Sequence, residues 1–124
     1  MLDYELDRAE GILIVMPGGP LESTDFEALV RDVDPYIREK GGLNGLMIYA
    51  EFFPGWDTFA AFLSHMRFVK DHHRDIRRIA AVTESGFLSI LPQVAGHFVR
   101  AEVRHFAYDD KVAALNWLKS GKGI

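Results

Sequence analysis

A chain of 124 residues, 48% hydrophobic and 26% charged, has the length and composition of a single folded domain spanning residues 1–124, and not of a disordered segment. Its formal net charge of −4 argues against nucleic-acid binding, and the lack of cysteine excludes disulfides, thiolate metal sites and a cysteine nucleophile. No apolar run reaches the ~20 residues of a membrane span, and residues 1–5 lack signal-peptide features, so we expect a cytoplasmic protein.

The first residues predict a β-hairpin. Residues 2–6 alternate weakly between apolar and polar types, residues 12–16 form an apolar run, and a charged turn that closes with Gly11 separates them. Prolines and glycines at residues 17–20 then stop the second strand, because neither residue type suits the interior of a sheet.

A helix is predicted to follow the hairpin. Residues 23–25 are favourable N-cap types, and apolar residues then recur at helical spacing as far as Ile37. Because proline lacks an amide hydrogen, we expect Pro35 to kink or break this helix near Asp34, and the glycines at residues 41–42 to end it.

Three strand-and-helix units complete the chain. The strands are predicted at residues 43–50, 76–83 and 101–108, and the helices follow them: one capped by Asp57 or Thr58 and closed by residues 72–75, one at residues 87–98, and one capped by Asp109 or Asp110 and ended by Gly121. The order β-β-α-β-α-β-α-β-α predicts an α/β fold with a mixed five-stranded sheet, mostly parallel, with one antiparallel N-terminal edge strand.

The junction after the strand at residues 43–50 is rich in large aromatic side chains around a Pro-Gly turn. Open α/β sheets bind ligands at the carboxyl ends of their strands, and exposed aromatic residues in a loop are typical of a binding surface. We therefore expect an apolar small molecule or a protein partner to bind here, with homodimerisation as a variant and with the junction at residues 85–87 as a neighbouring wall. The expected ligand-binding residues are Glu51, Phe52, Phe53, Trp56, Phe59, Ser85 and Phe87.

The chain resembles the SpoIIAA-like family of bacterial proteins in four segments: residues 4–16, 49–57, 77–80 and 106–117. The resemblance covers nearly the whole chain and implies a STAS-like sheet with strands in near-sequential order. It also implies a relation to the CRAL-TRIO lipid carriers, which agrees with the aromatic junction. STAS anti-sigma antagonists carry a phosphorylatable serine at the equivalent junction. This chain has no serine there, and Thr58 is the nearest hydroxyl that an antagonist-like signalling module could use.

Catalytic and metal chemistry have weaker signals. Glu51 could act as a general acid or base with Asp57 or a histidine, but no nucleophile motif accompanies it, and we predict no catalytic residue. The five histidines lack the spacing of a zinc site, so we predict no metal and no cofactor. Arg77 and Arg78, with Lys70 and Arg74, are expected to form a solvated basic cluster.

Overall fold

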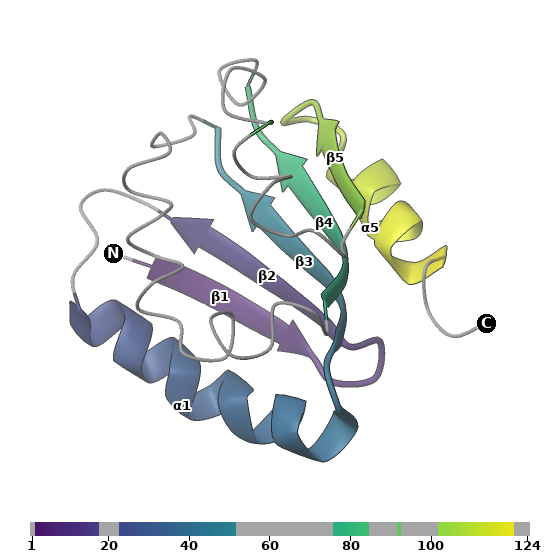
Figure 1. Cartoon of the computed structure of the whole chain (residues 1–124). Helices are drawn as coiled ribbons and strands as arrows, with labels where there is room; N and C mark the ends of the chain where they lie inside the picture. Colours follow the sequence, from purple (N-terminus) through teal and green to yellow (C-terminus); the bar gives the residue numbers. More distant parts are fainter. Residues whose placement is uncertain (1, 18–22, 52–75, 85–91, 93–101, 121–124) are drawn as a thin grey trace.

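A mixed sheet of five strands forms the centre of the structure, a computed structural model that describes residues 2–17, 23–51, 76–84, 92 and 102–120 (Figure 1). In chain order the described elements are β1 (Leu2–Asp7), β2 (Ile12–Pro17), α1 (Ser23–Lys40), β3 (Leu43–Tyr49), β4 (Ile76–Val82), β5 (Glu102–Phe106) and α5 (Lys111–Ser120). The strands lie side by side in the order β1-β2-β3-β4-β5.

The pairing of the strands confirms the predicted α/β class. β1 pairs antiparallel with β2 at one edge, and β2, β3, β4 and β5 then pair in parallel. The sequential strand order and the single antiparallel edge are those that the resemblance implied. The helices predicted at residues 58–75 and 87–98 lie outside the described residues.

The hairpin turn depends on Gly11, whose φ of +70° is in the region that side chains disfavour. The Gly11 amide donates to the Asp7 carbonyl at 2.8 Å, which closes the turn. Asn44, near the start of β3, also binds the turn, because its side-chain amide donates to the Glu10 carbonyl at 2.8 Å. A Cβ on residue 11 would lie 2.9 Å from that amide nitrogen, so the position has no room for a side chain.

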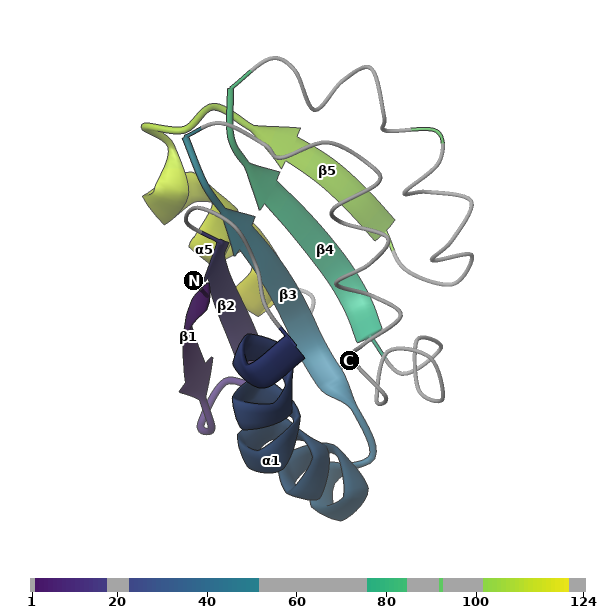
Figure 2. The same cartoon turned by 90° about the vertical axis from the view of Figure 1, so that its left-hand side faces the viewer.

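The two helices of the described residues, α1 and α5, cover opposite faces of the sheet (Figure 2). Tyr4 pairs with Val15 in the hairpin, and its hydroxyl donates to Asp32 of α1, so α1 lies on the Val15 face. The neighbouring position, Ile14, points to the other face and packs against α5. Buried residues on the α5 face are Ile12, Ile14, Met47, Ala80, Val82, Phe106, Ala114 and Leu118.

The alternate strand positions on the α1 face are equally apolar and buried. They are Leu13, Val15, Leu46, Ile48, Ile79 and Ala81. Burial on both faces explains why residues 12–16 of β2, 46–49 of β3 and 79–82 of β4 are continuous apolar runs in the sequence and not alternating patterns.

Of the two outcomes expected at Pro35, a break is wrong, because α1 continues through it to Lys40, and a kink stays a prediction. Proline removes one hydrogen bond, to the carbonyl four residues earlier, and its ring lies on the exposed side of the helix. Val33 and Ile37 are buried on either side of it, and the Arg38–Asp34 ion pair at 2.7 Å spans it. The helix ends as expected at Gly41, whose amide donates to the Ile37 carbonyl at 2.7 Å.

Neither described helix combines the length and the apolar character needed to cross a membrane.

Candidate functional site

The carboxyl ends of β3 and β4 are joined beyond the last strand residues. The Ala50 amide donates to the Val82 carbonyl at 3.1 Å, and the Glu84 amide donates to the Glu51 carbonyl at 3.0 Å. The segments that follow β3 and β4 therefore leave the sheet as hydrogen-bonded neighbours. Because these strands are parallel, the segments that follow them start from the same edge, which is where open α/β sheets bind ligands.

Thr83 connects the carboxyl ends of β3 and β4 to β5 by hydrogen bonds. It is the buried polar residue of the described core, with 0% of its surface exposed. Its hydroxyl donates to the Glu51 carbonyl at 3.3 Å, and its amide donates to the Phe106 carbonyl at 3.2 Å. His105 of β5 adds a ring nitrogen 2.9 Å from the Thr83 carbonyl. One residue thus holds the ends of three strands in fixed positions.

Glu51 is the member of the predicted site that the structure describes. Its side chain is exposed to solvent, and within the described ranges no hydrogen bond or ion pair to its carboxylate is found. Glu51 contributes to the edge through its backbone carbonyl, which accepts hydrogen bonds from the Thr83 hydroxyl and the Glu84 amide.

The remaining predicted residues lie outside the described part of the chain. They are Phe52, Phe53, Trp56, Thr58, Phe59, Ser85 and Phe87. The structure does show that Glu51 and Glu84, the residue before the predicted second wall, are hydrogen-bonded neighbours. That adjacency is the part of the predicted site that the described residues support, and the gathering of the aromatic side chains stays a prediction.

Sequence reasoning missed an aromatic pair at the same edge, on the α5 face. Tyr49 of β3 and Tyr108, just after β5, stack with ring centroids 4.9 Å apart and planes 15° apart. Hydrogen bonding to Tyr49, followed by burial, raises the pKa of Tyr108 above its ordinary value. The Lys111 ammonium lies 4.6 Å from the Tyr49 ring, which is the geometry of a cation–π contact.

A signal for this pair was present in the strand pattern. Tyr49 and Phe106 both pair with Val82 in the parallel register, so all three residues point to the same face. Tyr108 follows Phe106 by two residues. Once the strand order is known, the alternation of the strands brings these aromatic side chains together at one end of the sheet.

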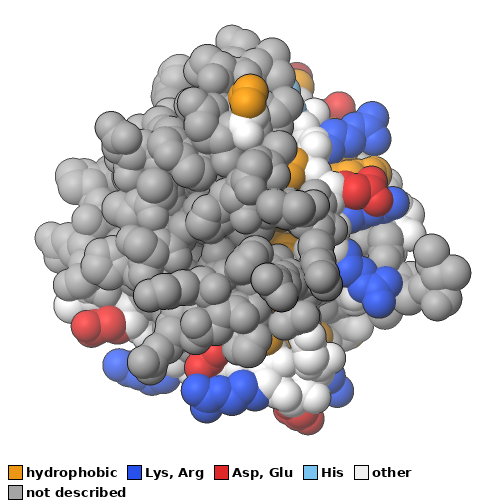
Figure 3. Space-filling model, viewed as in Figure 1, with side chains coloured by type: hydrophobic (Ala, Val, Ile, Leu, Met, Phe, Trp, Pro, Cys, Tyr) orange, Lys and Arg blue, Asp and Glu red, His pale blue; other side chains and the backbone are white. Residues whose placement is uncertain are grey.

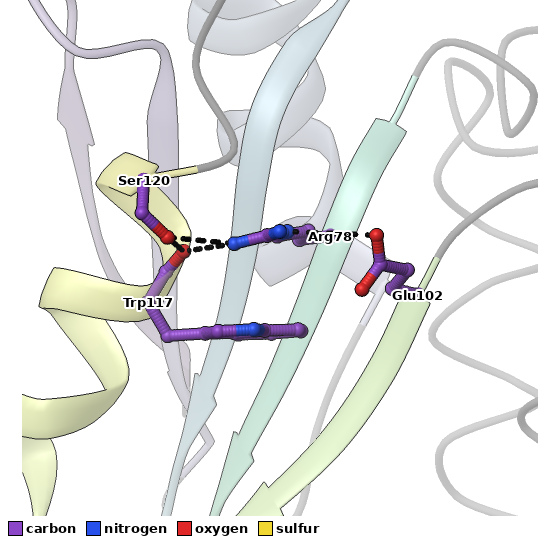
Figure 4. A network of polar contacts seen from close by, with 4 residues as sticks. All are labelled: Arg78, Glu102, Trp117 and Ser120. Carbon is purple, nitrogen blue, oxygen red and sulfur yellow. Dashed lines mark hydrogen bonds and ion pairs between the residues drawn. The ribbon is translucent and has the colours of Figure 1, made fainter.

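Arg78 is not part of a solvated cluster, contrary to the expectation from the sequence. Its guanidinium donates to the Trp117 carbonyl at 2.6 Å and to the Ser120 hydroxyl at 2.7 Å, and it lies 4.9 Å over the Trp117 ring (Figure 4). Glu102 is an ion-pair partner 3.8 Å away. Arg78 points to the α5 face, whereas Arg77, one position earlier, is exposed. At the last turn of α5 a positive charge complements the helix dipole.

A mixed sheet with its strands in sequence order, one antiparallel edge strand and helices on both faces defines a STAS-like α/β domain. A family model described as SpoIIAA-like matches residues 12–119, and the chain belongs to the SpoIIAA-like family. Searches of curated proteins and of solved structures gave no match.

Proposed function

We propose that this chain is a non-enzymatic cytoplasmic binding domain whose site lies at the carboxyl ends of β3 and β4. The observation that carries the proposal is the fixed edge built by Thr83, which joins the ends of β3, β4 and β5. A site needs such a rigid base, because binding groups held on a firm scaffold lose less entropy when a ligand arrives.

An apolar, lipid-like ligand fits the sequence that leaves this edge. Phe52, Phe53 and Trp56 follow Glu51 within five positions, and each ring would gain roughly 1.5–3 kcal/mol from complete burial. A ligand that covers them would recover this free energy. A binding role is preferred to an enzymatic one because no nucleophile motif accompanies Glu51 in the sequence.

The test uses Trp56 as a reporter. The chain has two tryptophans, so Trp117→Phe leaves Trp56 as the single emitter. We expect a fatty acid, a phospholipid or an isoprenoid to shift its emission to shorter wavelength and to raise the melting temperature. The Trp56→Phe variant, which reports from Trp117 on α5, is the matched control and should show no shift. A broad lipid panel that changes neither emission nor melting temperature would contradict the ligand proposal.

A protein partner, including a second copy of the chain, is the variant of this proposal. Aromatic side chains at such an edge are also typical of protein interfaces. Light scattering separates the two cases, because Trp56→Ala should dissociate a dimer that is built on these rings and should leave a monomeric lipid carrier unchanged in mass.

Membership of the SpoIIAA-like family supports a second candidate, a STAS-type signalling module. Thr58 would then receive the phosphate at the start of the segment after β3. A kinase that modifies the wild-type chain and fails to modify Thr58→Ala is the expected result. Modification that persists in Thr58→Ala would contradict this assignment.

A further inference from the structure

Two of the four tyrosines of the chain, Tyr49 and Tyr108, lie in direct ring contact. The other two use their hydroxyls on different partners: Tyr4 donates to Asp32, and Tyr36 donates to a carbonyl of the hairpin turn. The stacked rings have their centroids 4.9 Å apart and their planes 15° apart. In such an offset stack, carbon atoms of the two rings touch at about 3.5–4.0 Å.

The hydroxyl ends of the two rings also meet. Hydrogen bonding to Tyr49, followed by burial, raises the pKa of Tyr108, and the charge of the Glu51 carboxylate acts in the same direction. The Glu51 carboxylate is therefore near enough to the Tyr108 phenol to accept its proton. Because the hydroxyls are hydrogen-bonded, the ring carbons ortho to them lie close to each other as well. These ortho carbons are the positions at which two phenoxyl radicals join.

Small water-soluble reagents can reach this pair. Both rings are partly exposed, whereas Tyr36 is 7% exposed. Residues 109–110, which follow Tyr108, are exposed, and charged side chains of both signs lie on the side of the molecule where β5 and α5 run (Figure 3). The Lys111 ammonium over the Tyr49 ring opposes the loss of an electron alone. It does not oppose the loss of a hydrogen atom, because the ring then stays neutral.

We propose that Tyr49 and Tyr108 are the site of an intramolecular dityrosine crosslink, formed by a one-electron oxidant that uses peroxide. Each phenol loses one hydrogen atom, as an electron to the oxidant and a proton to water or to Glu51, and becomes a neutral phenoxyl radical. The two radicals form a bond between their ortho carbons. Those carbons then lose their protons and the oxygens regain protons, which restores two phenols. One hydrogen peroxide takes up the two electrons and two protons and becomes two waters.

The crosslink connects the end of β3 to the segment after β5, across β4. It closes a loop from residue 49 to residue 108 and so removes conformational freedom from the unfolded chain, as a disulfide does. The chain has no cysteine, so a disulfide cannot supply such a connection. The crosslinked protein should therefore melt at a temperature higher by roughly 10 °C.

The test treats the full chain, at low concentration, with a haem peroxidase and hydrogen peroxide. We expect the blue fluorescence of dityrosine in a product that migrates as a single chain on a denaturing gel and has lost the mass of two hydrogen atoms. Mass spectrometry of a digest should find the peptide with Tyr49 joined to the peptide with Tyr108. Tyr49→Phe and Tyr108→Phe each remove one hydroxyl and should abolish both the fluorescence and the rise in melting temperature.

Tyr4→Phe and Tyr36→Phe are the matched controls, because they remove a hydroxyl from tyrosines outside the stacked pair, and both should keep the crosslink. Trp56→Ala should keep it too, so a failure here is distinguishable from a failure of the carboxyl-edge proposal. The inference would be overturned by the absence of dityrosine, by dityrosine that persists in Tyr108→Phe, or by crosslinks found only between two chains.

Discussion

Gly45 sits where β3 passes under α5. A Cβ at this position would lie 2.8 Å from Leu118 Cδ2 and 3.0 Å from Leu118 Cβ, closer than packed carbon atoms come. The missing side chain lets Leu118 rest directly on the β3 backbone. A glycine inside a strand costs stability on its own, and here its role is the close approach of the helix.

Gly45→Ala should therefore destabilise the fold by about 1–3 kcal/mol, the range typical of an overpacked core. The β-carbon forces α5 outward, because the Leu118 Cβ cannot rotate away. Urea unfolding measures the change. In the Leu118→Ala background the cost of Gly45→Ala should be smaller, and an equal cost in both backgrounds would show that the contact with Leu118 is not the reason.

Tyr4 fastens β1 to α1 through its hydroxyl. The hydrogen bond to Asp32, followed by burial, raises the pKa of Tyr4 above its ordinary value of 10.0. The neutral phenol is favoured in the folded state, so the contribution of Tyr4 to stability is complete below pH 10.0. It is lost as the pH rises through the higher pKa of the folded state.

Tyr4→Phe should lower the free energy of unfolding by about 0.5–1.5 kcal/mol at neutral pH. The difference between the two proteins should shrink in alkaline solution, as the tyrosine of the wild type ionises. Chemical unfolding at a series of pH values measures this. A difference that stays constant from neutral to strongly alkaline pH would contradict the role of the hydroxyl.

At the scale of elements, α5 is too short to be stable alone, since isolated helices of fewer than about 12 residues are marginal in water. Ala114 and Leu118 bury one side of it against the sheet. Arg78 binds the C-terminal end of α5 by donating hydrogen bonds to the Trp117 carbonyl and the Ser120 hydroxyl. The last turn of α5 thus depends on a strand that lies 39 residues earlier in the sequence.

Arg78→Gln should make the last turn of α5 open more often. Loss of hydrogen bonds from a charged donor costs roughly 1.5–3 kcal/mol when the groups are buried, and less here because Arg78 is partly exposed. Amide hydrogen exchange at residues 117–120 should speed up, with α1 unaffected. Arg77→Gln is the control, because Arg77 is exposed, and it should leave exchange in α5 unchanged. Uniform acceleration in both helices would indicate global destabilisation and would contradict the local role.

Sequence patterns over a few neighbouring residues predicted the strands and helices well, but they predicted the contacts between distant strands and helices less well. The hairpin, β3, β4 and α5 follow from turn residues, apolar runs and helix caps, which act over a few neighbouring residues. A break at Pro35 did not occur because burial of α1 on the sheet outweighs one lost hydrogen bond. Arg78 and the Tyr49–Tyr108 pair depend on the register between strands far apart in the chain, which no short segment encodes.

For the molecule as a whole, the carboxyl edge of the sheet and its α5 face differ in chemistry. The carboxyl edge combines the fixed end of β3, at Glu51, with the aromatic sequence that follows it. On the α5 face, the Arg78 and Arg104 guanidinium groups lie over the Trp117 ring. The sequence indicated the first side from strand-end aromatic residues, and it gave no indication of the second, because the cations come from β4, β5 and α5.

The most direct test of the carboxyl-edge site is an amide NMR titration of the full chain with oleate. The account predicts that the amides of Glu51, Thr83 and Glu84 shift as oleate is added, while the amide of Lys119 on α5 stays in place. Shifts confined to α5, or no shift at saturating oleate, would contradict a lipid-binding site at the ends of β3 and β4.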